Sequence, residues 1–435
     1  MATPISFPGA PDKHEPISAA SAVSGNRPGR VEWFMDQALG MFIHWSVDSQ
    51  LGSVISHSMA GASPDYLHRF IHELPRTFRP TRFDPDEWAR LAKVAGMKYV
   101  VFTTKHHSGF CMFDTQTTGF NIMHTPYGRD ITREIVDAFR RWGIAIGFYF
   151  SPDDFWILHK QGHEISRDSF ECDPRNNPEL MAHNQAQLRE LLTNYGPVDV
   201  LFFDGVADGL KQLAWQLQPD VVVTRGDMAT PEQKIPDRPL PGPWEACFTL
   251  GTQWAYKPTH EEYKSGTQLI EMLIETRAKG GNLLLNVGPK PDGEIPVEQT
   301  ARIQEMALWN FVNHEAIYEI RPHAIIREPL NLDNEVWYTR SKDGRTVYAI
   351  LTGKPWPKGE RKVITLKHVA ATPATEAEIL GQSGQVLEYR PDVLPEASWS
   401  QDERGLHISA VHAQRLYNNN RWPNPVVVKI SEVAG

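Results

Sequence analysis

The sequence predicts an irregular (β/α)8-type barrel followed by a C-terminal β-sandwich. Two observations predict the barrel: short, almost continuously apolar runs recur between residues 40 and 320, and amphipathic helical patterns separate them. Strands that alternate with helices indicate parallel strands joined by helical crossovers. A third observation predicts the sandwich, because the pattern changes near residue 322 to short alternating strands without helical stretches.

The first thirty residues are rich in Pro, Ser, Gly and Ala, and we expect them to form an extended N-terminal arm over residues 1–30. They lack the apolar segment of a signal peptide. The compartment therefore stays open: secreted or periplasmic if a signal has been removed, and cytoplasmic otherwise. The barrel domain is expected at residues 31–321 and the sandwich at 322–435.

Six apolar runs are the predicted barrel strands, because strands buried on both faces lack polar alternation. They are GMFIHW (40–45), YVVFTTK (99–105), IAIGFYFS (144–151), VDVLFFDG (198–205), VVVTRG (221–226) and NLLLNVGP (282–289). An open doubly wound sheet is the alternative architecture. No GxGxxG motif opens a helix after any of these runs, which disfavours a dinucleotide-binding fold.

Helical patterns fill four of the intervals between the runs, and each ends in a glycine, as helices commonly do. They cover residues 84–96, 131–143, 177–196 and 265–281. In the first of them Asp84 is the expected cap and Pro85 opens the helix. Four alternating runs predict sandwich strands: NEVWYTRS (334–341), TVYAILTG (346–353), RKVITLKH (361–368) and PVVVKIS (425–431).

Composition excludes several classes of protein. The formal net charge is −9, and no basic run is present, so a nucleic-acid partner is not expected. No apolar run reaches the roughly 18 residues of a membrane span. Three widely spaced cysteines predict neither a disulfide framework nor a zinc site. A homo-oligomer is compatible with this composition, which does not decide the oligomeric state.

Polar groups end several of the apolar runs, where a parallel barrel carries its catalytic residues. They are His44, Lys105, His106, His107, Tyr149, Asp204, Arg225 and, after a proline-rich loop, Glu245. A barrel built for stability alone does not need so many titratable groups on one rim. Each of them taken singly has a structural alternative, as a satisfied rim or core group.

Asp204 and Glu245 are the candidate catalytic pair. Asp204 ends a strongly apolar run, and Arg225 and the histidines are candidates to keep it ionised, as a nucleophile requires. Glu245 follows Trp244, an apolar neighbour that raises a carboxyl pKa towards that of a general acid. Two such carboxylates suit a retaining glycosidase, with an expected separation of about 5–5.5 Å. The alternatives are a helix cap for Asp204 and a loop surface position for Glu245. If Glu245 is not the acid, Glu232 and Glu261 are the next candidates.

The histidine pair admits a metal-site interpretation, which the sequence disfavours. Consecutive residues on a regular strand point to opposite faces, so His106 and His107 are not expected to bind one ion. Neither a metal nor another cofactor is expected. We interpret both histidines, together with His44 and Tyr149, as hydrogen-bonding partners of sugar hydroxyl groups.

Several segments together resemble the α-L-fucosidases of glycoside hydrolase family 29. They are FIHW (42–45), residues 83–115, GRDI (128–131), GFYFSPDD (147–154), residues 188–205 and AKGGNLLLNVGPKPDGEI (278–295). The resemblance covers residues 31–321 and implies a retaining, metal-free mechanism acting on fucosylated oligosaccharides or polysaccharides. It further implies that Asp204 is the nucleophile and Glu245 the acid/base.

The resemblance also implies the substrate contacts, which include His44, His106, His107 and Tyr149, and we add Phe202, Arg225 and Trp244 to them. Residues 46–66 depart from the family, because they lack its Glu-Trp-Tyr type segment. His57 and Asp65 are candidates to replace those contacts. This departure leaves the linkage open, and also the choice between fucose and L-galactose. An inactive carbohydrate-binding relative and a metal-dependent barrel hydrolase are the rival functions.

Overall fold

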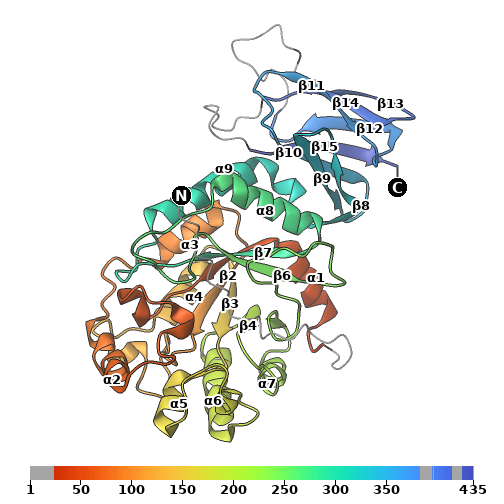
Figure 1. Ribbon diagram of the computed structural model, residues 1–435. Coiled ribbons are helices and arrows are strands. Elements are labelled where there is room, and N and C mark those ends of the chain that lie inside the picture. Colours follow the sequence, from red (N-terminus) through yellow and green to blue (C-terminus); the bar gives the residue numbers. More distant parts are fainter. Residues whose placement is uncertain (1–23, 383–393, 395, 414–423, 435) are drawn as a thin grey trace.

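The computed structural model describes residues 24–382, 394, 396–413 and 424–434, and Figure 1 shows a parallel sheet with helices around it, joined to antiparallel sheets near the C-terminus. Residues 1–23, most of the predicted arm, lie outside this description. Helix α1 (Pro28–Gln37) begins inside the predicted arm, with Pro28 in its first turn. Asn26 Nδ2 donates to the carbonyl of Val223 at 2.9 Å, so the barrel domain includes residues before position 31.

The parallel sheet confirms the predicted irregular barrel. Within the described residues its strand order is β5-β4-β3-β2-β1-β7-β6. The strands are β1 (Leu39–Ile43), β2 (Tyr99–Lys105), β3 (Ala145–Phe150), β4 (Val200–Phe203), β5 (Val222–Val223), β6 (Glu245–Thr249) and β7 (Asn282–Val287). Strands β5 and β6 are the two edges, and single bridges from Ala229 to Trp244 and from Glu232 to Cys247 partly fill the interval between them. The barrel is therefore irregular at this seam.

Helices cover the outer face of the barrel sheet (Figure 1). After α1 they are α2 (Pro64–His72), α3 (Pro85–Val94), α4 (Ile131–Arg141), α5 (Phe155–Gln161), α6 (Pro178–Asn194), α7 (Leu210–Leu217), α8 (Gly266–Ala278) and α9 (Val297–Asn313). Short 3-10 helices are η1 (Val47–Gln50), η2 (Ile55–His57), η3 (Leu74–Thr77), η4 (Ile122–His124), η5 (Phe170–Cys172) and η6 (His314–Ala316). The Asp84 carboxylate accepts from the backbone N–H groups of Asp86 and Glu87, as predicted for a cap. Among the described residues, no helix combines the length and apolar character that a bilayer crossing requires.

Two antiparallel sheets form the C-terminal part and confirm the predicted sandwich. Their strand orders are β12-β15-β10-β9-β8 and β11-β14-β13. The strands are β8 (Ile320–Pro329), β9 (Asn334–Ser341), β10 (Thr346–Gly353), β11 (Arg361–Leu366), β12 (Ala371–Ile379), β13 (Ser398–Asp402), β14 (Gly405–Val411) and β15 (Val426–Val433). Apolar side chains of both sheets pack against each other, among them Val336, Ile364 and Ile408.

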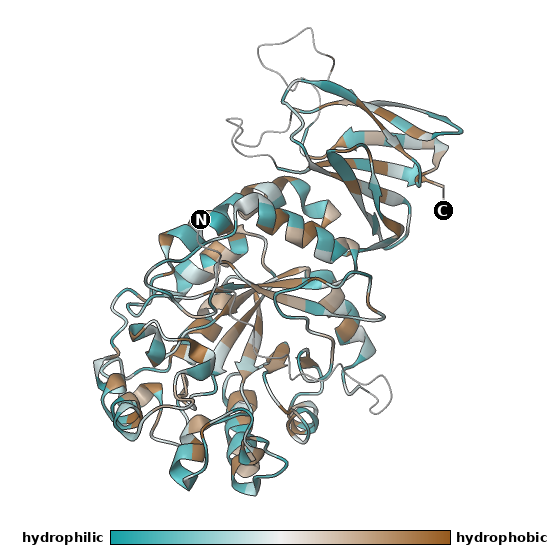
Figure 2. Cartoon of the chain, viewed as in Figure 1, coloured by the Kyte–Doolittle hydropathy of each residue, from teal (hydrophilic) through white to brown (hydrophobic). Residues whose placement is uncertain are grey.

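The barrel interior holds a compact aromatic cluster. Its members point inward from neighbouring strands and include Phe42, Tyr99, Tyr149, Phe202, Cys247 and Leu284. Figure 2 shows the same apolar character along the strands of the barrel sheet, whereas the surrounding helices alternate between apolar and polar residues. The interior is thus filled by side chains, and polar groups gather where the strands end.

Candidate active site

Asp204 directly follows β4, at the carboxyl end of the barrel. Its backbone N–H donates to the carbonyl of Phe150 at 3.1 Å, which fixes the start of the loop. Gly205 then adopts a φ of 150°, and a Cβ at this position would lie 2.8 Å from Asp153 Oδ1. Glycine is required here because both the backbone conformation and the close approach exclude a side chain.

Four side chains surround the Asp204 carboxylate, of which only 12% is exposed. The Tyr149 hydroxyl donates to Oδ2 at 2.7 Å, and His107 Nε2 lies 3.4 Å from the same oxygen. Arg225 Nη1 and Arg167 Nη2 lie 3.3 and 3.5 Å from Oδ1. Two guanidinium groups favour the charged carboxylate, which is the form a nucleophile needs.

Tyr149 is a neutral hydrogen-bond donor in this arrangement. Its ring is fully buried and stacks on Phe202 with centroids 5.7 Å apart. Burial, reinforced by the negative charge of Asp204, raises the pKa of Tyr149 well above 10. The hydroxyl therefore keeps its proton near pH 7 and donates a hydrogen bond to Oδ2.

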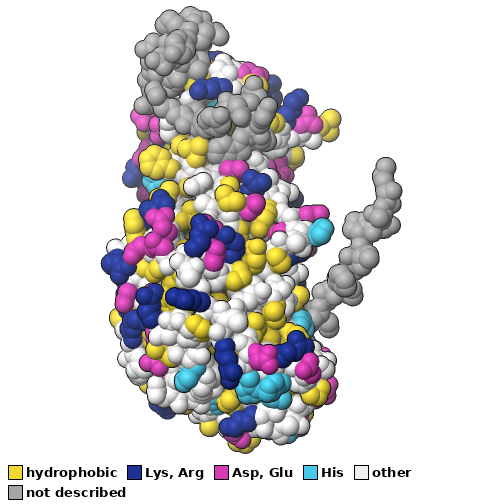
Figure 3. Space-filling view, turned by 90° about the vertical axis from the view of Figure 1, so that its left-hand side faces the viewer, with side chains coloured by type: hydrophobic (Ala, Val, Ile, Leu, Met, Phe, Trp, Pro, Cys, Tyr) yellow, Lys and Arg dark blue, Asp and Glu magenta, His cyan; other side chains and the backbone are white. Residues whose placement is uncertain are grey.

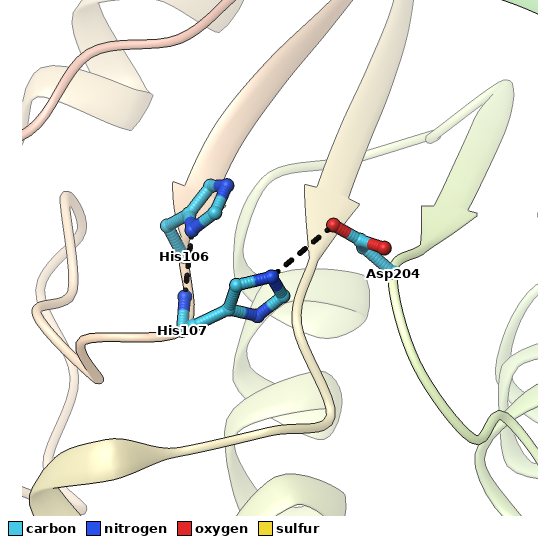
Figure 4. Close-up of side chains that lie close together, drawn as sticks. All are labelled: His106, His107 and Asp204. Carbon is cyan, nitrogen blue, oxygen red and sulfur yellow. Dashed lines mark hydrogen bonds and ion pairs between the residues drawn. The ribbon is translucent and has the colours of Figure 1, made fainter. Parts of the chain in front are cut away.

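His106 and His107 lie close to Asp204 (Figure 4), and ligand atoms of the three residues lie within 4.8 Å of one another. The prediction that the two rings point to opposite faces was wrong. Strand β2 ends at Lys105, so its alternation does not extend to this pair. The trio has donor types that suit a metal, but the Arg225 and Arg167 guanidinium groups beside Asp204 oppose a bound cation.

His44 completes the group from β1. Its Nδ1 lies 2.6 Å from Asn286 Oδ1, and its ring centroid lies 5.5 Å from those of His106 and Tyr149. Burial lowers the pKa of His44 from 6.5 to about 3, so the ring is neutral near pH 7. Because the Asn286 oxygen accepts, Nδ1 carries the proton and Nε2 keeps its lone pair as an acceptor.

The structure brings most of the predicted residues together. His44, His106, His107, Tyr149, Asp204 and Arg225 meet at one end of the barrel, with Phe202 beneath them. His57 is an exposed residue of η2, and partial burial lowers its pKa, with smaller contributions from the neighbouring His107 and Arg167. Asp65 does not join them, since its carboxylate pairs with Arg69 on α2 at 2.8 Å.

Glu245 is not on this rim, and the expectation that it lies at a strand end beside Asp204 was wrong. It is the first residue of β6, whereas Asp204 follows the last residue of β4, and the strands are parallel. Its fully buried carboxylate accepts from the Tyr99 hydroxyl, at the start of β2. Cys247 lies two residues further along β6, a rise of about 6.6 Å, and its Sγ lies 3.7 Å from Arg225 Nη2. Arg225, which contacts Asp204, thus lies level with Cys247 and not with Glu245. Glu245 therefore lies in the lower barrel interior.

Trp244 is likewise remote from the pocket, contrary to its prediction as a substrate contact. Its indole N–H donates to the carbonyl of Lys279 at 3.3 Å, and a Cβ on Gly281 would lie 2.4 Å from the ring. The residue is buried between α8 and the start of β7. The sequence prediction placed Trp244 and Glu245 at the carboxyl end of a strand. In the structure the proline-rich loop precedes β6, so both residues lie at the amino end of that strand.

Two groups of this site, Arg167 and Trp254, were not predicted from the sequence. Arg167 comes from the loop before η5, and its Nε donates to Asp153 Oδ2 at 2.6 Å. Trp254 follows β6, with its ring 5.0 Å from His44 and 5.8 Å from Phe42. Neither Arg167 nor Trp254 ends an apolar run, so no strand-end pattern marks them in the sequence. Asp153, the partner of Arg167, lies three residues beyond β3 within the SPDD segment.

Glu232, one of the two further candidate acids in the sequence, is the acidic side chain that shares a partner with Asp204. Arg225 Nη1 lies 2.9 Å from Glu232 Oε2 and 3.3 Å from Asp204 Oδ1, so these oxygens are at most about 6 Å apart. About a third of the Glu232 side chain is exposed. A second acidic group, Glu261, accepts from the Thr252 N–H at 2.8 Å, just beyond the end of β6.

A buried ion pair between Lys105 and Asp154 lies beneath the residues at the carboxyl end of the barrel. Lys105 Nζ lies 3.1 Å from Asp154 Oδ2, and both side chains are fully buried. The same ammonium group donates to Asn184 Oδ1 at 2.8 Å, and Asn184 Nδ2 donates to the carbonyl of Pro152. This network fixes the turn that carries Asp153, and through it Arg167.

Comparison with known proteins gives matches to α-L-fucosidases. A family model described as Alpha-L-fucosidase matches residues 14–315. The chain is 31% identical to the plasma alpha-L-fucosidase of Homo sapiens over 401 residues, which cover 82% of each chain. It is 29% identical to the human tissue alpha-L-fucosidase over 87% of this chain and 84% of the relative.

Solved structures agree in fold. Alpha-L-fucosidase isoenzyme 1 from Paenibacillus thiaminolyticus superimposes with a TM-score of 0.75 at 29% identity, over 93% of this chain and 99% of that one. A GH29 alpha-L-fucosidase from Bacteroides thetaiotaomicron, trapped as a covalent intermediate with 2-fluoro-fucosyl fluoride, gives a TM-score of 0.73 at 24% identity. That match covers 95% of this chain and 98% of the other.

Proposed function

The chain belongs to the α-L-fucosidase family of glycoside hydrolases, and from that premise we propose that it hydrolyses terminal α-L-fucosides with net retention, using Asp204 as the nucleophile. One observation carries the assignment. The Asp204 carboxylate ends β4 and is held between two arginines, a tyrosine and a histidine at the catalytic end of a parallel barrel. Fucosylated oligosaccharides or polysaccharides are the substrates this implies.

The reaction proceeds in two displacements. Asp204 attacks the anomeric carbon, the glycosidic bond breaks, and a general acid gives its proton to the departing oxygen. A fucosyl ester on Asp204 results. The same group, now a base, then takes a proton from water, whose oxygen attacks the anomeric carbon and releases both fucose and the free carboxylate.

We assign the acid/base role to Glu232 in preference to Glu245. Its carboxylate oxygen lies at most about 6 Å from that of Asp204, compatible with the roughly 5–5.5 Å of retaining enzymes. Its partial exposure gives water access in the second step. Glu261, which has no arginine within its described hydrogen bonds, is the other carboxylate to test.

The sugar-binding part of the proposal rests on groups that stay neutral. Burial lowers the pKa of His106 well below 6.5, as it does for His44, so both rings exchange hydrogen bonds with sugar hydroxyls without carrying charge. Trp254 is partly buried beside His44 and offers an apolar face. We assign that face to the C5 methyl group, which distinguishes fucose from L-galactose.

Labelling with 2-fluoro-fucosyl fluoride tests the nucleophile directly. The reagent should inactivate the protein and add one 2-fluorofucosyl mass to the peptide that contains Asp204. A label on a different carboxylate would remove Asp204 from this role. Release of p-nitrophenol from the aryl α-L-fucoside, compared with the α-L-galactoside and with chelator present, tests the sugar and the metal-free mechanism.

A further inference from the structure

Helix α2 carries two exposed histidines, His68 and His72, on one face. They are four residues apart, which makes them neighbours on the helix surface. Their ring centroids lie 4.9 Å apart, with the ring planes inclined by 51°. Figure 3 shows histidine side chains gathered in a patch on one face of the molecule, low in that view. The two imidazoles are therefore already side by side in solvent.

We propose that His68 and His72 form a chelating site for a divalent transition cation such as Zn²⁺ or Ni²⁺. Imidazole nitrogen is a ligand that suits Zn²⁺, Cu²⁺ and Ni²⁺. Two histidines at positions i and i+4 on one helical face are the arrangement by which zinc-binding helices present two ligands to one ion. Water completes the coordination of the exposed cation.

The position of the pair within α2 favours a positive charge. His72 is the last residue of the helix, where unpaired carbonyl groups leave a partial negative charge. The neighbouring Arg69 is engaged by Asp65, with Nη2 2.8 Å from Oδ2, so its charge is partly offset. Glu73 follows directly and is exposed, adding a further negative charge near the site.

The opposite face of α2 is fixed in the protein. Leu67, Phe70 and Ile71 are buried in the main hydrophobic core. The exposed face can therefore bind a cation without rearrangement of the helix, and a cation that joins His68 to His72 ties the last turn of a nine-residue helix. Binding should therefore raise the thermal stability of the protein.

Calorimetric titration of the full chain with ZnCl₂ and NiCl₂ tests the site, with MgCl₂ as the probe that oxygen-preferring sites would favour. We expect Zn²⁺ and Ni²⁺ to bind and Mg²⁺ not to bind. Either His68→Asn or His72→Asn should weaken Zn²⁺ binding by at least about tenfold, which is about 1.4 kcal/mol. The control His159→Asn, which changes a single exposed histidine on α5, should leave it unchanged.

Two further readouts separate this site from the His106, His107 and Asp204 group. Zn²⁺ should raise the Tm of the parent protein and of His159→Asn, but not that of His68→Asn. Without added metal, both α2 variants should hydrolyse the aryl α-L-fucoside at the parental rate. Undiminished Zn²⁺ binding in both α2 variants, or no Zn²⁺ binding by the parent, would overturn the proposal.

Discussion

At the scale of single residues, the environment of Asp204 supports its proposed role as the nucleophile. Both of its oxygens are engaged, Oδ2 by Tyr149 and Oδ1 by Arg225 and Arg167. These partners hold the charge in place without covering the carboxylate completely, since 12% of the side chain remains exposed. Geometry and electrostatics thus support the same role.

Replacing Asp204 with Ala should lower kcat on the aryl α-L-fucoside by at least about 10³-fold, because no other carboxylate can form the covalent ester. Circular dichroism should show that the fold persists, since the side chain lies at the barrel rim. Substantial residual turnover with a native spectrum would contradict the nucleophile assignment.

If Glu232 is the general acid, its loss should affect substrates with poor leaving groups more than substrates with good ones. Glu232→Gln should slow hydrolysis of a fucosyl disaccharide far more than that of the aryl fucoside, by about 10²-fold or more, because only the poor leaving group needs a proton. Kinetics of both substrates measure this ratio. The same selective loss in Glu261→Gln, and not in Glu232→Gln, would transfer the role to Glu261.

Glu245 provides a stability prediction of defined sign. Burial raises its pKa from 4.5 to about 7, so the folded state binds a proton more tightly than the unfolded state. Its stabilising contribution is complete below pH 4.5 and is lost as the pH rises towards 7. Glu245→Gln keeps a neutral group beside Tyr99, so the variant should not lose this stability as the pH rises.

The free energy of unfolding of Glu245→Gln, relative to the parent, should therefore rise between pH 5 and pH 8 by up to about 3 kcal/mol. Urea titrations at several pH values measure the difference. The Glu232→Gln variant is the matched control, because Glu232 lies at the partly exposed rim. A pH-independent difference for Glu245→Gln would show that its carboxyl is not protonated in the folded protein.

At the scale of elements, the turn after β4 decides where the Asp204 carboxylate points. Gly205→Ala forces a Cβ to within 2.8 Å of Asp153 Oδ1 at a φ of 150°. We expect a loss of about 1–3 kcal/mol in stability and a fall in kcat, because Asp204 and the Asp153–Arg167 pair must move. Chemical denaturation and kinetics measure the two effects.

Gly162→Ala is the control for that variant. Gly162 also has a positive φ, 74°, but nothing lies within 4 Å of its added Cβ. It should cost stability through backbone strain alone and leave kcat unchanged. An equal loss of kcat in both variants would mean that the close contact at Gly205 does not position Asp204.

The element scale also explains which helices and strands were predictable. The helices at 84–96, 131–143, 177–196 and 265–281 correspond to α3, α4, α6 and α8, because a capping residue and a closing glycine mark each of them locally. The run at 221–226 yields only the two-residue strand β5. The segment that follows it is joined to β6 and the residue before it by the single bridges at Ala229 and Glu232 and not by a regular ladder. Pairing is a property of the sheet, not of the segment.

At the scale of the whole molecule, one hydrophobic cluster extends from the barrel helices into the sandwich. Trp337, Ile350 and Val427 of the sandwich belong to the same buried cluster as the barrel residues. The Trp309 indole on α9 donates to the carbonyl of Pro425 at 2.8 Å. The sandwich therefore packs against α8 and α9 of the barrel.

This continuity predicts a single cooperative unfolding transition for the full chain. Differential scanning calorimetry should give one endotherm whose van't Hoff and calorimetric enthalpies agree. Trp309→Ala, which removes a buried side chain at the junction, should lower its Tm without splitting it. Two separable transitions in the parent would show that the two parts unfold independently.

The amino-acid sequence was enough to predict the barrel and sandwich classes, most of the barrel strands and the group around Asp204. Apolar runs, caps and strand-end residues are local signals, and parallel strands bring their carboxyl ends to one rim. Three features follow only from the folded chain: β6 begins at Glu245, His106 and His107 turn to one side, and Arg167, Glu232 and Trp254 lie beside the other site residues. These depend on strand register and loop paths, which are set by long-range packing that no local pattern encodes.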